Sequence, residues 1–330
     1  MTSPSLIPNE SLPSASHDIT FATHLRQLPP AAQPISTLTP LSPHLPPIAA
    51  LSSSRKTHVM SILNLTPDSF SDGGTHSTTD MPTLTQTIRH HLAAGATILD
   101  IGGQSTRPGA PQVSASEELS RIQPALHLLR SIPEASRAAV SVDTYRASVA
   151  AAAVRAGAHM VNDVSGGALD PAMLPAVAAL GCTVCLMHMR GTPATMARLT
   201  DYGPDGVVAG VGRELRARVA AAERAGVRRW RILLDPGIGF AKTQAQNLEL
   251  LRRLGELREL DGLRGIPWLV GASRKAFVGR ITGVAEPRER VWGTAAAVAA
   301  AVQGGADVVR VHDVEEMGLV VRMADAIWRV

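Results

Sequence analysis

Short apolar stretches alternate with longer, helix-like stretches from about residue 57 to the end of the chain. The apolar stretches have the length of strands and lie at 58–63, 97–101, 138–142, 159–162, 183–187, 231–234, 267–271 and 307–311. The predicted helices between and after them lie at 81–94, 115–131, 145–156, 171–180, 206–225, 243–259, 287–303 and 314–328. Strands that alternate with helices predict βαβ units and a parallel sheet. Eight such repeats predict an α/β protein with a (β/α)8 TIM barrel.

Residues 1–55 differ in composition from the rest of the chain. Ten of the 23 prolines lie before residue 50, among Ser, Thr and Leu, without a clear periodicity. Such a composition cannot bury a core, so we expect a disordered Pro/Ser-rich tail. The tail lacks the apolar centre of a signal peptide and the arginines of a transit peptide. The predicted organisation is a leader or linker at 1–55 followed by a barrel at 56–330.

The overall composition narrows the possible partners. The 330 residues suit one barrel of roughly 250 residues plus the tail. No apolar run reaches the ~18 residues of a transmembrane helix, so we expect no membrane partner. The net charge of +4 is scattered and only 3% of the residues are aromatic, so we expect no nucleic-acid partner.

The two cysteines, Cys182 and Cys185, form a C-x-x-C pattern. A redox pair would require the first cysteine near a helix N-terminus. Here the surrounding GCTVCLMHM is typical of a buried strand, in which these side chains point to opposite faces. We therefore interpret them as two buried thiols, and their small number indicates a cytoplasmic rather than a secreted protein.

Nearly every predicted strand ends in a polar or charged cluster. In a (β/α)8 barrel the carboxyl ends of the strands meet on one face, where active sites lie. The candidate residues at these ends are Asn64, Arg107, Asp143, Asn162, Asp235, Lys275, Arg310 and His312. The predicted pocket therefore combines anion-binding groups with carboxylates.

Asp143, Asn162 and Asp235 each end an apolar strand. Buried carboxylates need hydrogen-bond donors, and a heterocycle rich in N–H groups, such as a 2-amino-4-oxo pterin, would supply them. Helix N-capping is the alternative role for Asp143 and for Asp163, because both precede predicted helices. Three such side chains at one barrel mouth favour the binding site.

Several groups at the same mouth suit an anion. Arg107 lies in GGQSTRPGA and offers the fork geometry that binds phosphate, although a lone loop arginine is more often solvated. The strand-to-helix passage at 270–279 presents backbone N–H groups, and Arg310 lies in the eighth strand, where barrels often bind phosphate. His312 alone would suit the core or a cap, but beside Arg310 it completes an anion site. Asn64 could hold the phosphate through Mg2+.

LMHMRGTPATM (186–196) places Met187 and His188 at the end of the fifth strand. A zinc site would need more His or Cys ligands than this region supplies. We interpret Met187 as an apolar wall for a flat ring.

The motifs ILNLTPDSFSDGG, DIGGQSTRPGA, SVDTYRA, NDVSGG, LMHMRGTP, LLDPGIGF, GASRK and RVHDV occur in this order. In this combination the chain resembles dihydropteroate synthase of folate biosynthesis over residues 57–330. The resemblance implies a transferase that condenses 6-hydroxymethyl-7,8-dihydropterin diphosphate with 4-aminobenzoate. It also implies an SN1-like course, in which the diphosphate leaves before the arylamine attacks.

The resemblance implies a role for each matching position. The pterin pocket would consist of Asp143, Asn162, Asp235, Lys275, Met187, Phe240 and Gly239. The diphosphate would bind Asn64, Arg107, Arg310 and His312, with Mg2+ on Asn64. The aminobenzoate pocket, where sulfonamides compete, would consist of Phe70, Thr106, Pro108 and Ser273. The catalytic roles would fall to Asp143, Lys275, Arg310 and Arg107.

Two alternatives to the synthase remain at this point. A methyltetrahydrofolate–corrinoid methyltransferase would share the pterin floor but would not need STRPG, SRK and RVHDV. A non-catalytic pterin-binding paralogue is expected to lose a loop or an arginine that this chain retains. The resemblance also implies a homodimer, which the small residues at 293–301 support. In fungal, plant and protist relatives a pterin pyrophosphokinase precedes this domain, which would make 1–55 a linker and a mitochondrial location the alternative.

Overall fold

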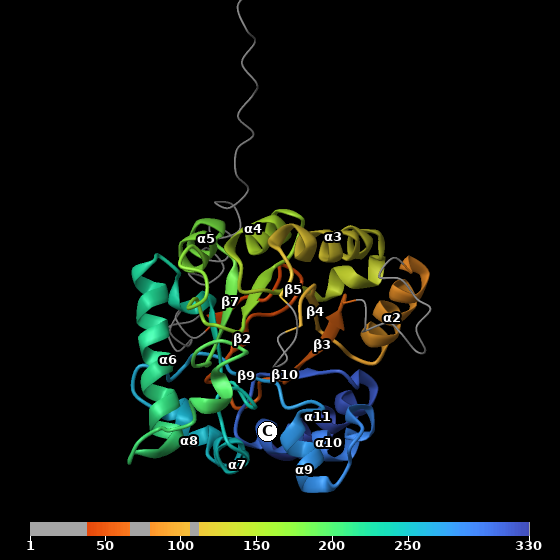
Figure 1. The fold of residues 1–330 in the computed structure, drawn as a ribbon. Coiled ribbons are helices and arrows are strands. Elements are labelled where there is room, and N and C mark those ends of the chain that lie inside the picture. The colour runs from red at the N-terminus through yellow and green to blue at the C-terminus, as the bar shows by residue number, and fades with distance from the viewer. Residues whose placement is uncertain (1–37, 67–79, 106–111, 330) are drawn as a thin grey trace, which may run out of the picture. The chain divides into compact units, whose positions relative to one another are not determined.

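The computed structural model describes residues 38–66, 80–105 and 112–329 (Figure 1). Its eight parallel strands are β3 (His58–Asn64), β4 (Ile98–Gly102), β5 (Ala139–Asp143), β6 (Met160–Asp163), β7 (Thr183–Met187), β8 (Ile232–Asp235), β9 (Leu269–Val270) and β10 (Val308–Val311). Their order in the sheet is β8-β7-β6-β5-β4-β3-β10-β9. An isolated bridge between Leu234 and Trp268 joins the two edge strands. The predicted barrel is confirmed.

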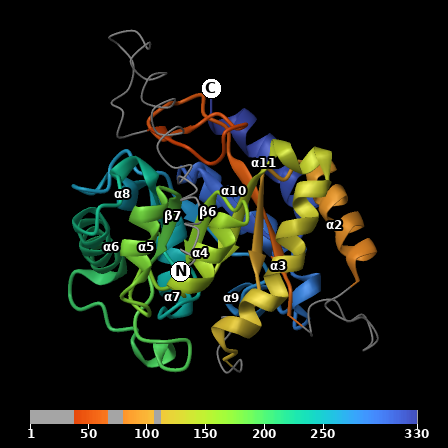
Figure 2. The ribbon, with the colours of Figure 1, turned by 90° about the horizontal axis from the view of Figure 1, so that it is seen from above.

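Helices surround the strands in both perpendicular views (Figures 1 and 2). They are α2 (Met81–Ala93), α3 (Ala115–Ser131), α4 (Ala147–Arg155), α5 (Met173–Leu180), α6 (Gly206–Arg224), α7 (Gln244–Arg252), α8 (Leu254–Glu259), α9 (Ala276–Thr282), α10 (Val291–Gln303) and α11 (Val314–Trp328). The helix predicted at 243–259 is two helices, because the backbone leaves the helical conformation at Arg253. None of the described helices is long and apolar enough to cross a membrane.

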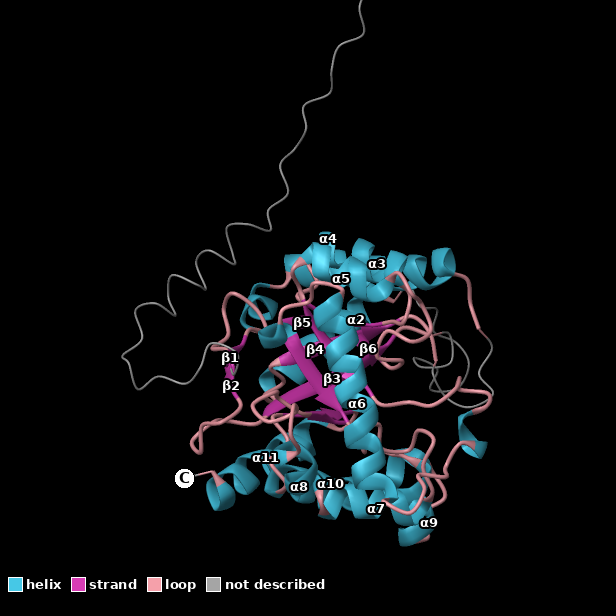
Figure 3. Ribbon diagram, turned by 90° about the vertical axis from the view of Figure 1, so that its left-hand side faces the viewer, coloured by secondary structure: helices cyan, strands magenta, loops and turns pink. Residues whose placement is uncertain are grey.

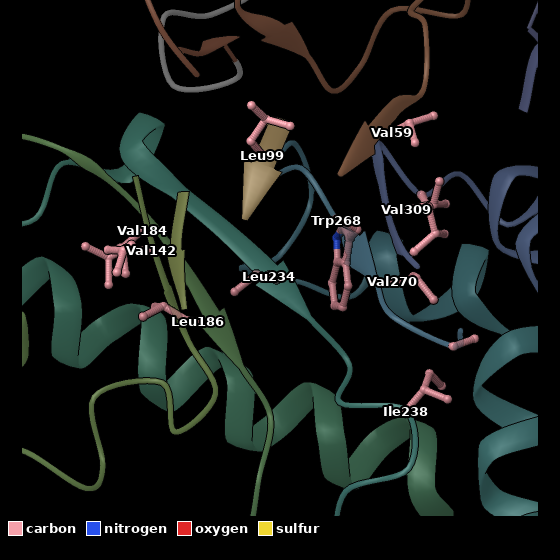
Figure 4. Close-up of a cluster of buried hydrophobic side chains, with 14 of the residues drawn as sticks. Val59, Leu99, Val142, Val184, Leu186, Leu234, Ile238, Trp268, Val270 and Val309 are labelled. Carbon is pink, nitrogen blue, oxygen red and sulfur yellow. The ribbon is translucent and has the colours of Figure 1, made fainter. Parts of the chain in front are cut away.

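The strand side chains alternate between two apolar environments, as the period of a β-strand requires. Those on the outer face, including Val59, Leu99, Val142 and Val309, pack in the core between strands and helices (Figure 4). Those on the inner face form a second core at the base of the barrel. Each strand contributes one residue to it: Met60, Ile98, Ala139, Met160, Cys185, Leu233, Leu269 and Val308.

A short hairpin covers this inner core. β1 (Leu38–Thr39) pairs antiparallel with β2 (Ile48–Ala49), and Figure 3 shows it at the end of the barrel opposite α9. Leu41 and Ile48 are 2% and 3% exposed and pack against the inner core. Thr183 Oγ1 donates a 2.6 Å hydrogen bond to Pro40 O. The expectation that residues 1–55 lack ordered structure is therefore wrong for residues 38–55, because tertiary packing outweighs composition there; residues 1–37 lie outside the described residues.

The two cysteines are reduced and buried in different cores. Cys182 packs between strands and helices, whereas Cys185 points into the barrel. Burial raises the pKa of the Cys182 thiol to about 11. The interpretation as two buried thiols is confirmed.

Candidate functional site

Two residues beyond the base core, most inward positions of the strands are polar. Alternate residues of a strand share a face, so the next inward positions follow directly from the core residues. Those positions include Asp100, Ser141, Asn162, Met187, Asp235 and Arg310. The interior of the barrel therefore changes from apolar to mainly polar and ionisable side chains over two residues of each strand.

Arg310 lies between two carboxylates. Its Nε donates to Asp100 Oδ2 at 2.6 Å, and its Nη2 donates to Asp143 Oδ2 at 2.7 Å. Asp100 Oδ1 and Asp143 Oδ1 are buried and have no hydrogen-bond partner in the part of the chain that the structure describes. Buried acceptors are normally satisfied, so a bound molecule with N–H groups fits these two oxygens.

Asp100 is a residue that the sequence analysis missed. It is fully buried and also accepts a 3.1 Å hydrogen bond from Asn162 Nδ2. The signal was present in ILDIG, where a charged residue stands inside an apolar strand two positions before Gly102 at its end. Because side chains alternate along a strand, Asp100 had to share the face of the strand end.

Asp235 and Lys275 lie on either side of the turn that follows β8. Asp235 Oδ1 accepts a 2.7 Å hydrogen bond from Gly237 N, and Lys275 Nζ donates to Ile238 O. Burial lowers the pKa of Lys275 to about 8, against the opposite effect of Asp235. The ammonium group is thus placed at the mouth by backbone contacts.

An apolar wall adjoins this pair, as predicted. Met187 is buried in a cluster with Met189 and Met196, and Phe240 packs against that cluster. Lys275 Nζ lies 4.7 Å from the centre of the Phe240 ring. Gly239 has φ +85°, and a Cβ there would lie 3.0 Å from Lys275 Cδ, so this position favours glycine.

Ser273 and His312 contact each other beyond the ends of β9 and β10. Ser273 Oγ lies 3.0 Å from His312 Nδ1 and accepts a 3.2 Å hydrogen bond from His312 N. His312 comes directly after β10, two positions beyond Arg310. Ser273, predicted for the aminobenzoate pocket, and His312, predicted for the diphosphate, are therefore in direct contact.

Asn64 and Asp143 flank Gly102. The strand register pairs Gly102 with both residues, and a Cβ at Gly102 would lie 3.6 Å from Asn64 Oδ1 and 3.8 Å from Asp143 Oδ2. No group of three or more His, Cys, Asp or Glu that could bind a metal occurs among residues 38–66, 80–105 and 112–329. Mg2+ commonly takes one or two protein oxygens together with water and substrate phosphate, so the amide oxygen of Asn64 fits such an ion.

Four predicted site residues, Phe70, Thr106, Arg107 and Pro108, lie outside the described residues. The residues on either side of 106–111 share one partner. Arg146 Nη1 donates to Gln104 Oε1 and Arg146 Nη2 donates to Val113 O, both at 2.5 Å. Arg146 also pairs with the buried Glu118. This network was not predicted, because its members are far apart in sequence.

The capping alternative is wrong for both aspartates. The residue that caps α4 is Arg146, whose side chain makes no capping hydrogen bond, while Asp143 contacts Arg310. Asp163 accepts hydrogen bonds from Ser165 and from Gly167 N in the turn after β6. Asp143 is thereby left at the barrel mouth.

The charges of Asp143 and Arg310 depend on each other. Burial raises the pKa of Asp143 to about 7, although Arg310 opposes this shift. Burial disfavours the charge of Arg310, but Asp100 and Asp143 outweigh it and raise the pKa of Arg310 above its usual value. The mouth therefore contains a permanent cation beside a carboxyl group that titrates near neutrality.

The chain matches the family model described as "Pterin binding enzyme" over residues 60–312. It is 50% identical to the folic acid synthesis protein fol1 of Pneumocystis carinii over 274 residues, which is 83% of this chain and 36% of that protein. It is 49% identical to the dihydropteroate synthase of Synechocystis over 278 residues, covering 83% of this chain and 91% of that enzyme.

A solved structure gives the same result. The Xanthomonas albilineans dihydropteroate synthase with 4-aminobenzoic acid superimposes with a TM-score of 0.74 and 43% sequence identity. The match covers 83% of this chain and 94% of that one. The chain therefore belongs to the dihydropteroate synthase family of pterin-binding enzymes.

Proposed function

We propose that this chain condenses 6-hydroxymethyl-7,8-dihydropterin diphosphate with 4-aminobenzoate, giving 7,8-dihydropteroate and pyrophosphate. The observation that carries the proposal is the pair of buried oxygens, Asp100 Oδ1 and Asp143 Oδ1, that have no hydrogen-bond partner among the described residues. They lie beside Arg310, which can bind an anion. One pocket thus offers acceptors to an N–H-rich ring and a cation to its phosphate.

The pterin contacts follow from the inward-facing polar residues. Asp100, Asp143 and Asp235 accept from the N–H and amino groups of the ring, and Asn162 and Lys275 donate to its acceptors. Met187 and Phe240 contact the ring faces. The support for this assignment is the burial of the carboxylates, which are stabilised only when donors reach them.

The reaction breaks the C–O bond between the exocyclic carbon and the diphosphate, and it forms a C–N bond to the arylamine, which loses a proton. Arg310 and His312 bind the departing diphosphate, with Arg107 as a further predicted contact. The carbon becomes positive as the diphosphate leaves, and the Asp143 carboxylate offsets that charge. A Ser–His nucleophile is not needed for this course.

A magnesium ion fits this proposal at Asn64. Its amide oxygen would bind the ion, which when present neutralises charge on the leaving diphosphate. The protein itself supplies Arg310 and His312 for the same anion, so the protein and the ion act on one group.

The second substrate would bind near Ser273, together with Phe70, Thr106 and Pro108. A Xanthomonas albilineans synthase has been solved with 4-aminobenzoic acid, which supports this molecule as the second substrate. Its place near Ser273 follows from the resemblance of the sequence motifs. A Yersinia pestis synthase has been solved with a sulfonamide drug, so we propose that sulfonamides compete at this pocket.

We also propose a homodimer through α11. Leu319, Met323 and Ile327 recur every four residues along this helix and are 58%, 63% and 51% exposed. Such an apolar stripe on a helix favours a protein partner. The small residues at 293–301 are a weaker argument than the sequence indicated, because Ala297 and Ala301 are buried in the chain's own core.

An upstream pterin pyrophosphokinase domain is the proposed context of residues 1–37. The chain spans only 36% of the Pneumocystis protein and 50% of an Arabidopsis protein named folate synthesis bifunctional protein, mitochondrial. These lengths leave room for further domains in those relatives. The proposed compartment is the cytoplasm, or the mitochondrion if the fusion applies here.

Pyrophosphate release by the purified full chain tests the function. The assay contains the pterin diphosphate, 4-aminobenzoate and Mg2+, with controls that lack each component. We expect release that depends on aminobenzoate and is matched by dihydropteroate. Pterin binding without release would instead favour a non-catalytic paralogue, and methyl transfer from methyltetrahydrofolate would favour the corrinoid methyltransferase class.

A further inference from the structure

We propose that Lys242 is a positioning residue for the pterin pocket, because its ammonium group fixes the turn at residues 237–241. This inference rests on the proposed function, since it names a residue that acts through the pterin contacts. Lys242 itself lies beneath the turn and is only 9% exposed. It has no assigned contact with either substrate.

The three N–H donors of Lys242 match three acceptors. Nζ lies 3.0 Å from Gly237 O, 2.9 Å from Phe240 O and 2.9 Å from His188 Nδ1. A lysine ammonium has three donors and no acceptor, so this set satisfies the charged form completely. Burial lowers the pKa of Lys242 to about 7, and Asp235 opposes this shift. Two of the three bonds end on the turn itself.

The two contacts of His188 together indicate the tautomer of its ring. The Glu214 carboxylate can only accept, so the proton of the neutral ring is on Nε2, which lies 3.1 Å from Glu214 Oε2, and Nδ1 accepts from Lys242. Burial lowers the pKa of His188 to about 4, so the ring stays neutral and can accept. Glu214 is in turn bound by Arg190 through Nε and Nη2.

The same chain of contacts returns to the turn. The Arg190 guanidinium lies 3.9 Å from the centre of the Tyr202 ring, and Tyr202 OH donates a 3.0 Å hydrogen bond to Ala241 O. Three carbonyls of the turn, at Gly237, Phe240 and Ala241, are therefore bound by one connected network. Apart from Lys242, the network comes from α6 and from the loop between β7 and α6.

The turn needs such support because its backbone is unusual. Ala241 has φ 49°, and Gly237 and Gly239 also have positive φ, at 67° and 85°. A left-handed conformation is unfavourable for a residue with a Cβ such as Ala241. At Gly237 a Cβ would lie 2.0 Å from His188 O, so only glycine allows this close approach.

The turn carries several pterin contacts at once. Phe240 supplies the apolar wall, Ile238 O accepts from Lys275, and Gly237 N donates to Asp235. Loss of the Lys242 contacts would therefore displace the pterin side of the site. The proposed diphosphate contacts, Arg310 and His312, belong to other strands and loops.

The test compares Lys242→Met, which keeps the length but removes the donors, with Lys242→Arg, which keeps a charge and donors. We expect Lys242→Met to raise the KM for the pterin diphosphate about tenfold or more, as expected for the loss of charged hydrogen bonds. The KM for aminobenzoate at saturating pterin should change less than about twofold, and Lys242→Arg should recover part of the loss. Tyr202→Phe removes one donor to the turn and should raise the KM for the pterin diphosphate by about threefold.

A core variant far from the site separates positioning from general stability. Leu129→Ala in α3 should lower Tm about as much as Lys242→Met does. It should not change the KM for the pterin diphosphate selectively. Nitrogen NMR of His188 should show the Nε2–H tautomer in the wild type and a changed Nδ1 shift in Lys242→Met. Equal changes in both KM values, or a profile like that of Leu129→Ala, would overturn the inference.

The proposed function can fail separately. If the wild-type chain releases no pyrophosphate, the function is wrong, and the affinity of the wild type and of Lys242→Met for 7,8-dihydropteroate then decides the inference. We expect Lys242→Met to bind 7,8-dihydropteroate more weakly than the wild type. Tyr202→Phe should weaken this binding to a smaller extent. Equal affinities would overturn it.

Discussion

The two ends of the barrel use the same strands for opposite purposes. At the base, one apolar side chain from each strand packs under Leu41 and Ile48. At the mouth, the inward positions of the same strands bear Asp100, Asn162, Asp235 and Arg310. Two carboxylate oxygens there lack partners within residues 38–66, 80–105 and 112–329. The residues that stabilise the fold and the residues suited to chemistry therefore lie at opposite ends of the barrel axis, as the barrel architecture allows.

Asp143→Asn should give the largest separation of the two ends. We expect kcat/KM to fall on the order of 10³-fold, because a neutral amide cannot offset the developing cation. The fold should lose little, because burial already raises the pKa of Asp143 to about 7 and Arg310 keeps its contact with Asp100. Steady-state kinetics and thermal unfolding measure the two effects. A parallel loss of Tm and activity would mean that the mouth is structural.

Leu41→Ala should do the reverse at the base. Truncation of a buried leucine costs roughly 2–5 kcal/mol of unfolding free energy. Activity at 25 °C should be unchanged, because the hairpin lies at the other end of the barrel from the site (Figure 3). Leu51→Ala is the control, since Leu51 is 39% exposed. Urea unfolding measures the loss of stability, and activity assays on the folded protein measure turnover. A loss of turnover in Leu41→Ala but not in Leu51→Ala would contradict the separation of stability at the base from chemistry at the mouth.

Catalysis at the mouth should depend on pH through two ionisable groups. The pKa of Asp143 is raised to about 7, so its carboxylate is lost as pH falls through 7. The pKa of Lys275 is lowered to about 8, so its charge is lost as pH rises above 8. We expect a bell-shaped profile of kcat/KM for the pterin diphosphate, with the acidic limb absent from the residual activity of Asp143→Asn. An unchanged acidic limb would assign it to another group.

Stability should respond to acid in a lower range. The pKa of His188 is lowered to about 4, so between pH 6.5 and 4 the unfolded chain binds a proton that the folded chain does not. Stability therefore falls as pH decreases through this window and is unaffected by His188 above it. Unfolding of the wild type and of His188→Gln between pH 7 and pH 4.5 measures the difference. Identical pH slopes would show that His188 does not contribute.

The smallest effect is expected on the outside of the barrel. Leu319→Arg places a charge in the exposed apolar stripe of α11 and should shift a dimer toward monomer, with Tm changed by little because Leu319 is 58% exposed. Analytical ultracentrifugation measures the proportion of dimer, and steady-state kinetics on the same sample measure activity. Glu316→Gln at an exposed position of the same helix is the control, because it also raises the net charge by one and leaves the apolar stripe intact.

The sequence predicted the barrel because long-range pairing follows from eight local apolar runs. It also predicted that Asp143, Asn162, Asp235, Lys275 and Arg310 meet at one mouth. It did not predict the hairpin around Leu41, since that segment is ordered by tertiary contacts rather than by its own periodicity. The Lys242–His188–Glu214 contacts were missed for the same reason, because their partners come from different elements.

The bridge between Leu234 and Trp268 has a consequence for local opening. Every other pair of neighbouring strands shares at least two register positions, whereas β8 and β9 meet only in this bridge. Opening free energies follow the number of contacts that must break, so amide exchange should be fastest at this seam among the barrel strands. The seam separates Asp235 from Lys275, so we expect local opening there to change the spacing between the two sides of the proposed pterin pocket while the other strands stay paired.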